Sequence, residues 1–205
     1  VWAVGTASGS PDIAYAEMGV EIRSEQIGDA LTQANDTMQA VTDALTGFGI
    51  ATTDIQTTQF NVYQEGQPQP MPGAEGQAMP PAQYVVTNIV RVTVRDINQV
   101  SDVIQTALDA GANRVYGLTF GLADQDALRS QARQEAAQSA GVQAQELAQA
   151  FNVQLGEPVR IDESTQGGVP VAESLAYGRG GGGPPISAGD LTVTVQLYVT
   201  YRVTP

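Results

Sequence analysis

The stretch that decides the fold runs from Asp96 to Glu163. It opens with DINQVSDVIQTALDAGANRVYGLTFGLAD (residues 96–124), continues through a long Gln- and Ala-rich run, and reaches LGEPVRI (residues 155–161). Apolar residues recur at helical spacing in the first segment and again in the Gln- and Ala-rich run, and a short apolar segment follows each of them. The stretch therefore predicts a helix, a strand, a long helix and a second strand, onto which the earlier segments can pack.

The first helix of this stretch has a start signal and a stop signal. Asp96 is the predicted N-cap with Gln99 at the capping-box position, and Gly111 is the natural C-terminal cap. The predicted buried face consists of Val100, Val103, Ile104, Ala107 and Leu108. The next strand covers residues 115–122, and Asn113 in the turn before it is predicted to tolerate a left-handed backbone.

The long helix starts at Asp124 or Asp126 and has an apolar face of mostly small residues. This face comprises Leu128, Ala132, Ala136, Ala140, Ala144, Leu147, Ala148 and Phe151. Small side chains allow a helix to approach a sheet or a partner helix closely. Gly141, in the middle of the helix, costs about 1 kcal/mol relative to Ala. A further strand is expected at residues 153–161.

The segments before this stretch read as strand, strand and helix. Residues 2–7 and 13–23 are separated by a turn cluster and could pair as an antiparallel hairpin. Ser24 is the predicted N-cap of the helix, and Gly47 and Gly49 end it. The apolar stripe of this helix is formed by Ile27, Leu31, Ala34, Met38, Val41 and Leu45.

Three more strands and two irregular inserts complete the chain. Residues 53–63, 84–95 and 191–203 show strand patterns. The inserts, 64–82 and 164–190, are rich in Gln, Pro and Gly, so they cannot bury enough apolar surface to offset their ordering entropy and should protrude as loops. The terminal strand is long and poor in charge, so we expect it to be covered by its own sheet or by a subunit contact.

These elements predict an α+β fold with a mostly antiparallel sheet and helices on one face. Ile13 to Leu122 has the element order of a ferredoxin-like split β-α-β core. The long helix and the C-terminal strands are additions to this core. From the length of 205 residues we expect a single domain over residues 1–205, with the two inserts as its irregular parts.

The composition excludes several kinds of chemistry. The formal charge is −13, from 22 acidic and 9 basic residues, and the chain has no Cys, His or Lys. It therefore has no thiolate nucleophile, no imidazole base and no Lys for a Schiff base or a P-loop. The acidic surface disfavours nucleic acid as a partner. No apolar run approaches the roughly 20 residues that span a bilayer, and we expect that a targeting segment lies upstream of Val1.

The carboxylates and glycines give no convincing site. Asp124, Asp126 and Glu135 mimic positions one, three and twelve of a Ca²⁺ loop, but Arg129 stands where the sharp turn needs Gly, so helix capping is favoured. The glycines at 180–183 are followed by two prolines, which favours a flexible loop over a phosphate cradle. Asp162-Glu163 and the other carboxylates read as solvated groups, and Arg129 and Arg133 are expected to pair with Glu135 or with a neighbouring subunit. No catalytic, cofactor-binding or metal-binding residue is predicted.

A set of short motifs recurs in order over nearly the whole chain. They are VGTA (4–7), PD (11–12), MGV (18–20), FGI (48–50), DIQT (54–57), VRD (94–96), DAGAN (109–113), GLTF (117–120), Ala132-Arg133 leading to Ala148, and GEP (156–158). In order and spacing they resemble the SIMPL-domain family.

The resemblance implies an exported or cell-envelope protein with no established catalytic activity, and we expect no enzymatic function. It also implies self-association into a homo-oligomer, for which a ring is one form, and a structural or stress-related role, with other envelope proteins as further partners. The alternative is a module that binds a ligand, a peptide or a glycan with the two long loops and nearby Tyr63, Tyr84 and Tyr177. An enzyme is the third reading, and it would require two close carboxylates in a cleft.

Overall fold

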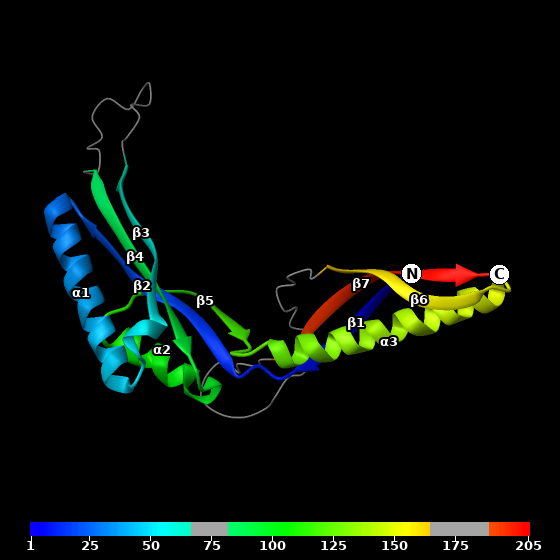
Figure 1. Cartoon of the computed structure of the whole chain (residues 1–205). Helices are drawn as coiled ribbons and strands as arrows, with labels where there is room; N and C mark the ends of the chain where they lie inside the picture. Colours follow the sequence, from blue (N-terminus) through cyan, green and yellow to red (C-terminus); the bar gives the residue numbers. More distant parts are fainter. Residues whose placement is uncertain (67–81, 165–188) are drawn as a thin grey trace, which may run out of the picture. The chain divides into compact units, whose positions relative to one another are not determined.

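The computed structural model describes residues 1–66, 82–164 and 189–205, so most of each predicted insert lies outside the described residues. The α+β prediction is confirmed: the described chain contains three α-helices and two antiparallel sheets (Figure 1). The strands are β1 (Trp2–Gly9), β2 (Ile13–Ser24), β3 (Ile55–Glu65), β4 (Gln83–Val94), β5 (Arg114–Gly121), β6 (Gln154–Ser164) and β7 (Leu191–Thr204). The helices are α1 (Ile27–Phe48), α2 (Val100–Asp109) and α3 (Asp126–Ala150), with 3₁₀ turns at Thr52–Asp54 and Ile97–Gln99.

The chain divides into two compact units. The central unit is Asp12–Phe120, and the discontinuous unit combines Val1–Pro11 with Gly121–Pro205. Each unit has its own sheet and its own apolar cluster. Whether the two units behave as the single domain expected from the length stays a prediction.

The central unit has the predicted element order. Its elements follow as β2-α1-β3-β4-α2-β5, and its sheet has the strand order β3-β4-β2-β5. The ferredoxin-like assignment itself stays a prediction. Helices α1 and α2 contribute to one apolar cluster with β2 and β4, which places both helices on the same face of the sheet. The buried members of that cluster include Ala16, Met18, Val20, Met38, Val41, Leu45, Val90, Val92, Val100 and Val103.

The caps of the central helices agree with the sequence in part. Gly49 and Gly111 have φ of 114° and 112°, the left-handed backbone expected at helix ends. Asp96 accepts the Asn98 N–H and so caps the 3₁₀ turn that leads into α2. The prediction that Ser24 is the N-cap of α1 is wrong, because Ser24 ends β2 and its hydroxyl accepts the Gln26 N–H instead.

The discontinuous unit is a three-stranded sheet covered by α3. The strand order is β1-β7-β6, and Figure 1 shows α3 running along this sheet. The predicted hairpin between the first two strands is wrong, because β1 pairs with β7 in a register that runs from Trp2 opposite Tyr198 to Gly9 opposite Leu191. The terminal strand β7 therefore lies in the middle of its sheet, which covers both of its edges as the charge-poor pattern requires.

A close contact between Gly5 and α3 holds this unit together. A Cβ atom at Gly5 would overlap the carbonyl oxygen of Ala132 and the amide nitrogen of Ala136, so the strand backbone lies directly against the helix backbone. The alanines that the sequence placed on the helix face are buried, at positions 132, 136, 140, 144 and 148. The small side chains and Gly5 together permit this approach.

We expect Gly5→Ala to lower the stability of the protein by about 1–3 kcal/mol, because the new methyl group must push α3 away from the sheet. The matched control is Gly141→Ala in the same helix. A Cβ there meets nothing within 4 Å, and Ala is favoured over Gly in a helix by about 1 kcal/mol. Thermal and urea unfolding should show opposite signs for the two variants, and equal effects would contradict the proposed contact.

Candidate functional site

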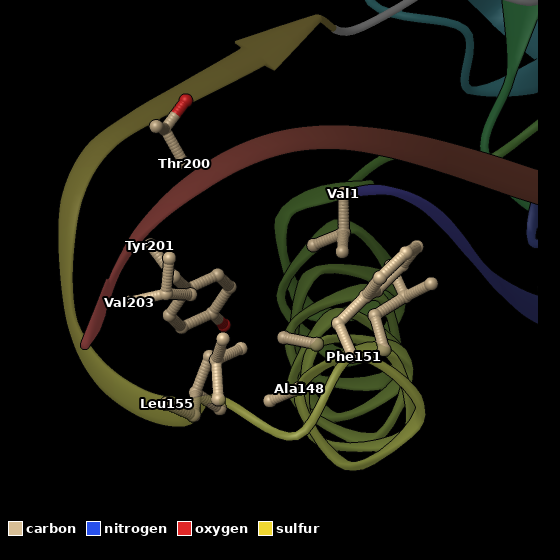
Figure 2. A pocket seen from close by; sticks show the side chains of 10 residues that line it. Val1, Ala148, Phe151, Leu155, Thr200, Tyr201 and Val203 are labelled. Atoms are coloured by element: carbon tan, nitrogen blue, oxygen red, sulfur yellow. The ribbon is translucent and has the colours of Figure 1, made fainter. Parts of the chain in front are cut away.

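An open apolar pocket lies in the discontinuous unit beside the C-terminal half of α3. Its volume is about 430 Å³. Its lining residues are Val1, Ala144, Leu147, Ala148, Phe151, Val153, Leu155, Thr200, Tyr201 and Val203. Figure 2 shows Ala148 and Phe151 on the helix side, with Leu155, Tyr201 and Val203 on the strand side. We call this feature the α3 pocket.

The α3 pocket follows from the way the helix ends. Ala144 and Ala148 present only methyl groups to the sheet, so the helix leaves space in front of the last residues of β7. After α3, Asn152 adopts a positive φ of 54°, and the Val153 N–H donates to the Ala148 carbonyl. This tight turn returns the chain to β6 and brings Leu155 to the strand side of the pocket.

The rim of the pocket is apolar and exposed. The exposed fraction is 74% for Phe151, 49% for Leu147 and 55% for Val203. The hydroxyls of Thr200 and Tyr201 are the only polar side-chain groups among the lining residues. Such a mostly apolar surface can hold another apolar group.

The surface around the α3 pocket is also unusually poor in charge for this protein. Between Ala136 and Gln154 the only charged residue is Glu146, and in β7 the only one is Arg202. The whole chain carries a formal charge of −13. This is therefore a surface on which two copies of an acidic protein can approach with little electrostatic repulsion.

The carboxylates that mimic a Ca²⁺ loop do not converge. The Asp126 N–H donates to Asp124 Oδ1, Arg129 pairs with Asp126, and Glu135 accepts the Thr6 N–H at 2.6 Å. These contacts give the carboxylates capping and bridging roles. Across residues 1–66, 82–164 and 189–205, no group of three acidic side chains is arranged to hold a metal ion.

The expected pairing of Arg133 with Glu135 is wrong. Arg133 donates two hydrogen bonds to Glu163, at 2.6 and 2.8 Å, and so links α3 to β6. This pairing lowers the pKa of Glu163 below its ordinary value. The two residues lie 30 positions apart, so only the fold brings them together, and their contact supports the packing of helix on sheet.

Asn113 has a different role from the predicted one. Among the described residues, Asn152 is the one residue other than glycine with a positive φ, so Asn113 does not adopt the left-handed backbone. Its side chain instead pairs with the backbone of Glu21, accepting from the N–H at 2.8 Å and donating to the carbonyl at 3.0 Å. The side-chain amide of Asn113 thus makes the pair of hydrogen bonds that the backbone of a neighbouring strand would make, at the point where β5 joins β2.

An ion-pair cluster surrounds this junction. The Glu21 carboxylate binds Arg114 and Arg23, both at 2.6 Å, and its side chain is only 10% exposed. The hydrogen bond from Arg114 lowers the pKa of Glu21, the charge of Arg23 acts in the same direction, and partial burial opposes both. Two arginines satisfy the one carboxylate, which is typical of a structural cluster rather than a catalytic one.

The loop residues of the alternative hypothesis are only partly described. Tyr63 lies in the exposed part of β3 and Tyr84 is the second residue of β4, whereas Tyr177 and the glycines at 180–183 lie outside the described residues. A binding site made by the two loops therefore stays a prediction. The α3 pocket was not predicted, although the sequence shows that the large side chains of Leu147 and Phe151 stand beside alanines on the same helix face.

Fold and site together define an α+β protein with an exposed apolar pocket and structural ion pairs. The SIMPL family model, described as a protein of unknown function (DUF541), matches residues 1–201. The chain belongs to the SIMPL family, as its motifs indicated.

Curated relatives cover much of the chain. The 26 kDa periplasmic immunogenic protein of Brucella melitensis is 26% identical over 210 residues, which is 97% of this chain and 82% of the relative. The uncharacterized protein YggE of Escherichia coli K12 is 30% identical over 154 residues, which is 74% of this chain and 60% of the relative. Neither name states an enzymatic activity. In the described part of the chain, every helix is too short or too polar to cross a membrane.

We expect Glu21→Gln to lower the melting temperature at pH 7, because the variant loses both ion pairs. Pairing lowers the pKa of Glu21 in the folded protein, so its stabilisation is present above the ordinary value of 4.5 and is lost as the pH falls through the lower folded value. The difference in melting temperature between wild type and variant should therefore shrink below pH 4.5.

Glu25→Gln is the control, since Glu25 is an exposed carboxylate just beyond the end of β2. It should change the melting temperature little at either pH. A Glu21→Gln difference that stays constant down to the lowest pH at which the protein is folded would contradict the assigned role of Glu21.

Proposed function

We propose that this chain is an exported, periplasmic protein without catalytic activity that works by self-association into a homo-oligomer. The observation that carries the proposal is the α3 pocket with its exposed, uncharged rim. The named location of the Brucella relative supports the compartment. A structural or stress-related role in the cell envelope, with other envelope proteins as partners, is part of the same proposal.

The energetic argument rests on the exposed rim of the α3 pocket. Phe151 and Leu147 are large apolar side chains that a single copy of the chain leaves 74% and 49% exposed. Full burial of such a side chain contributes about 1.5–3 kcal/mol. A second copy that covers the rim gains this contribution at several positions together.

Charge favours a second copy at this surface over other parts of the molecule. Two copies that each carry −13 repel one another over most orientations. Between Ala136 and Gln154 the only charged residue is Glu146, and in β7 the only one is Arg202, of opposite sign. A contact made by these two segments therefore buries apolar surface and involves few charged side chains.

A small apolar ligand in the α3 pocket is the second candidate. The volume of about 430 Å³ lies in the range of small-molecule sites, which runs from about 300 to 1,000 Å³. The Thr200 and Tyr201 hydroxyls could orient the polar end of such a ligand. A peptide or glycan held by the two long loops is the further alternative from the sequence.

We expect Phe151→Asp to reduce the particle mass measured by size-exclusion chromatography with light scattering. The new carboxylate adds like charge and removes the largest apolar side chain of the rim. Because Phe151 is 74% exposed, the fold of the single chain should be unaffected. Circular dichroism checks that point.

Val142→Asp is the matched control, because Val142 is 58% exposed on the same helix and does not line the pocket. It should keep the wild-type mass. A wild-type protein that has the mass of one chain, 21.4 kDa, at high concentration would refute self-association. A wild-type mass retained by Phe151→Asp would remove the pocket from the contact and favour the apolar ligand.

A further inference from the structure

We infer that copies of this chain pair edge to edge through the sheet of the central unit, with β5 of one copy adding to β3 of the next. The inference rests on the proposed self-association and names a surface for it that is separate from the α3 pocket. It comes from a contrast between the two sheets in how their edge strands are protected.

The β6 edge of the discontinuous unit is protected against pairing. Edge strands resist the addition of another strand when they carry charges, Pro or bulges. β6 carries Glu157, Arg160, Asp162 and Glu163, it contains Pro158, and its register with β7 shifts twice. A strand added to β6 would meet charged side chains and an interrupted row of hydrogen-bonding groups.

The β1 edge of the same sheet is protected by α3. The backbone N–H of Thr6 donates to Glu135 Oε2 at 2.6 Å, and the Thr6 hydroxyl contacts the same oxygen at 3.5 Å. The helix backbone also lies against Gly5. The Thr6 N–H, which an added strand would need as a hydrogen-bond donor, is therefore already bonded to Glu135. The helix also occupies the space next to Gly5.

The two edges of the central sheet lack this protection. β5 has no charged residue from Val115 to Gly121, and it contains no Pro. β3 has one register shift, between Thr57 and Gln59, and then runs without charge from Gln59 to Gln64 in unbroken pairing with β4. No described residue pairs with the outer edge of either strand.

The side chains on these edges are also those of a contact surface. Val115 and Tyr116 on β5 are 46% and 53% exposed, and Phe60 on β3 is 50% exposed. Long, uncharged edges with exposed apolar and aromatic side chains invite pairing with another strand. The two uncharged runs are of similar length, seven residues on β5 and six on β3.

The strand order selects a second copy as the occupant. The sheet is antiparallel and has an even number of strands, β3-β4-β2-β5, so its two edge strands run in opposite directions. When two copies point the same way, β5 of one copy and β3 of the next meet as an antiparallel pair, which continues the alternation of the sheet. One kind of contact then covers both unprotected edges, as a head-to-tail assembly requires.

The test places a Lys on each edge in turn. Val115→Lys on β5 and Phe60→Lys on β3 should each lower the particle mass relative to wild type, measured by light scattering and by native mass spectrometry. Ile161→Lys is the matched control, since Ile161 is 62% exposed on the protected β6 edge. It should keep the wild-type mass. Thr119→Lys and Gln59→Lys, which replace exposed polar residues on the same two edges, repeat the test if either apolar replacement lowers the melting temperature.

The outcomes separate this inference from the proposed function. A wild-type mass of one chain refutes self-association and the edge pairing together. A wild-type oligomer whose mass survives both edge variants refutes the edge pairing alone. A loss of mass with only one of the two edge variants, or an equal loss with Ile161→Lys, also overturns it, because the inferred contact needs both unprotected edges and neither protected one.

Discussion

The contact on which the discontinuous unit depends is the approach of two backbones, Gly5 in β1 and residues 132–136 in α3. It lets alanines form the buried helix face, where they pack in one cluster with Ala3, Ala7 and Val195 of the sheet. Towards the end of the helix two further alanines, Ala144 and Ala148, line an open pocket together with residues of β7. The alanines of α3 therefore belong to a tight helix–sheet interface near residues 132–136 and to an open pocket near residues 144–148.

The central unit relies on a comparable approach within its sheet. A Cβ at Gly19 would overlap the carbonyl of Asn88, so β2 and β4 come together with no room for a side chain at that point. Asn113 then extends the sheet by pairing with the backbone of Glu21. Both glycines fall inside short motifs that identified the family, which gives those motifs a physical reason.

Periodicity and caps were enough to predict the element types, the α+β class and the alanine face of α3, because these depend on neighbours close in the chain. The partner of β1 and the partner of Arg133 were not predictable, because each lies far away in the sequence. The α3 pocket was missed for a related reason. Helical spacing assigned Leu147 and Phe151 to the buried face with the alanines, and only the path of β7 leaves them exposed.

The pairing of Trp2 with Tyr198 has a consequence for how the protein is made. During synthesis the residues of the central unit are complete long before β7 emerges, so that unit can fold while β1 still lacks its sheet partner. Closing a chain segment of this length carries an entropic cost, but the cost grows only slowly with length, and a prefolded central unit shortens the flexible part of the segment. β7 is synthesised long after β1 and completes the sheet that β1 begins, so a chain that stops before Leu191 lacks the strand with which β1 pairs.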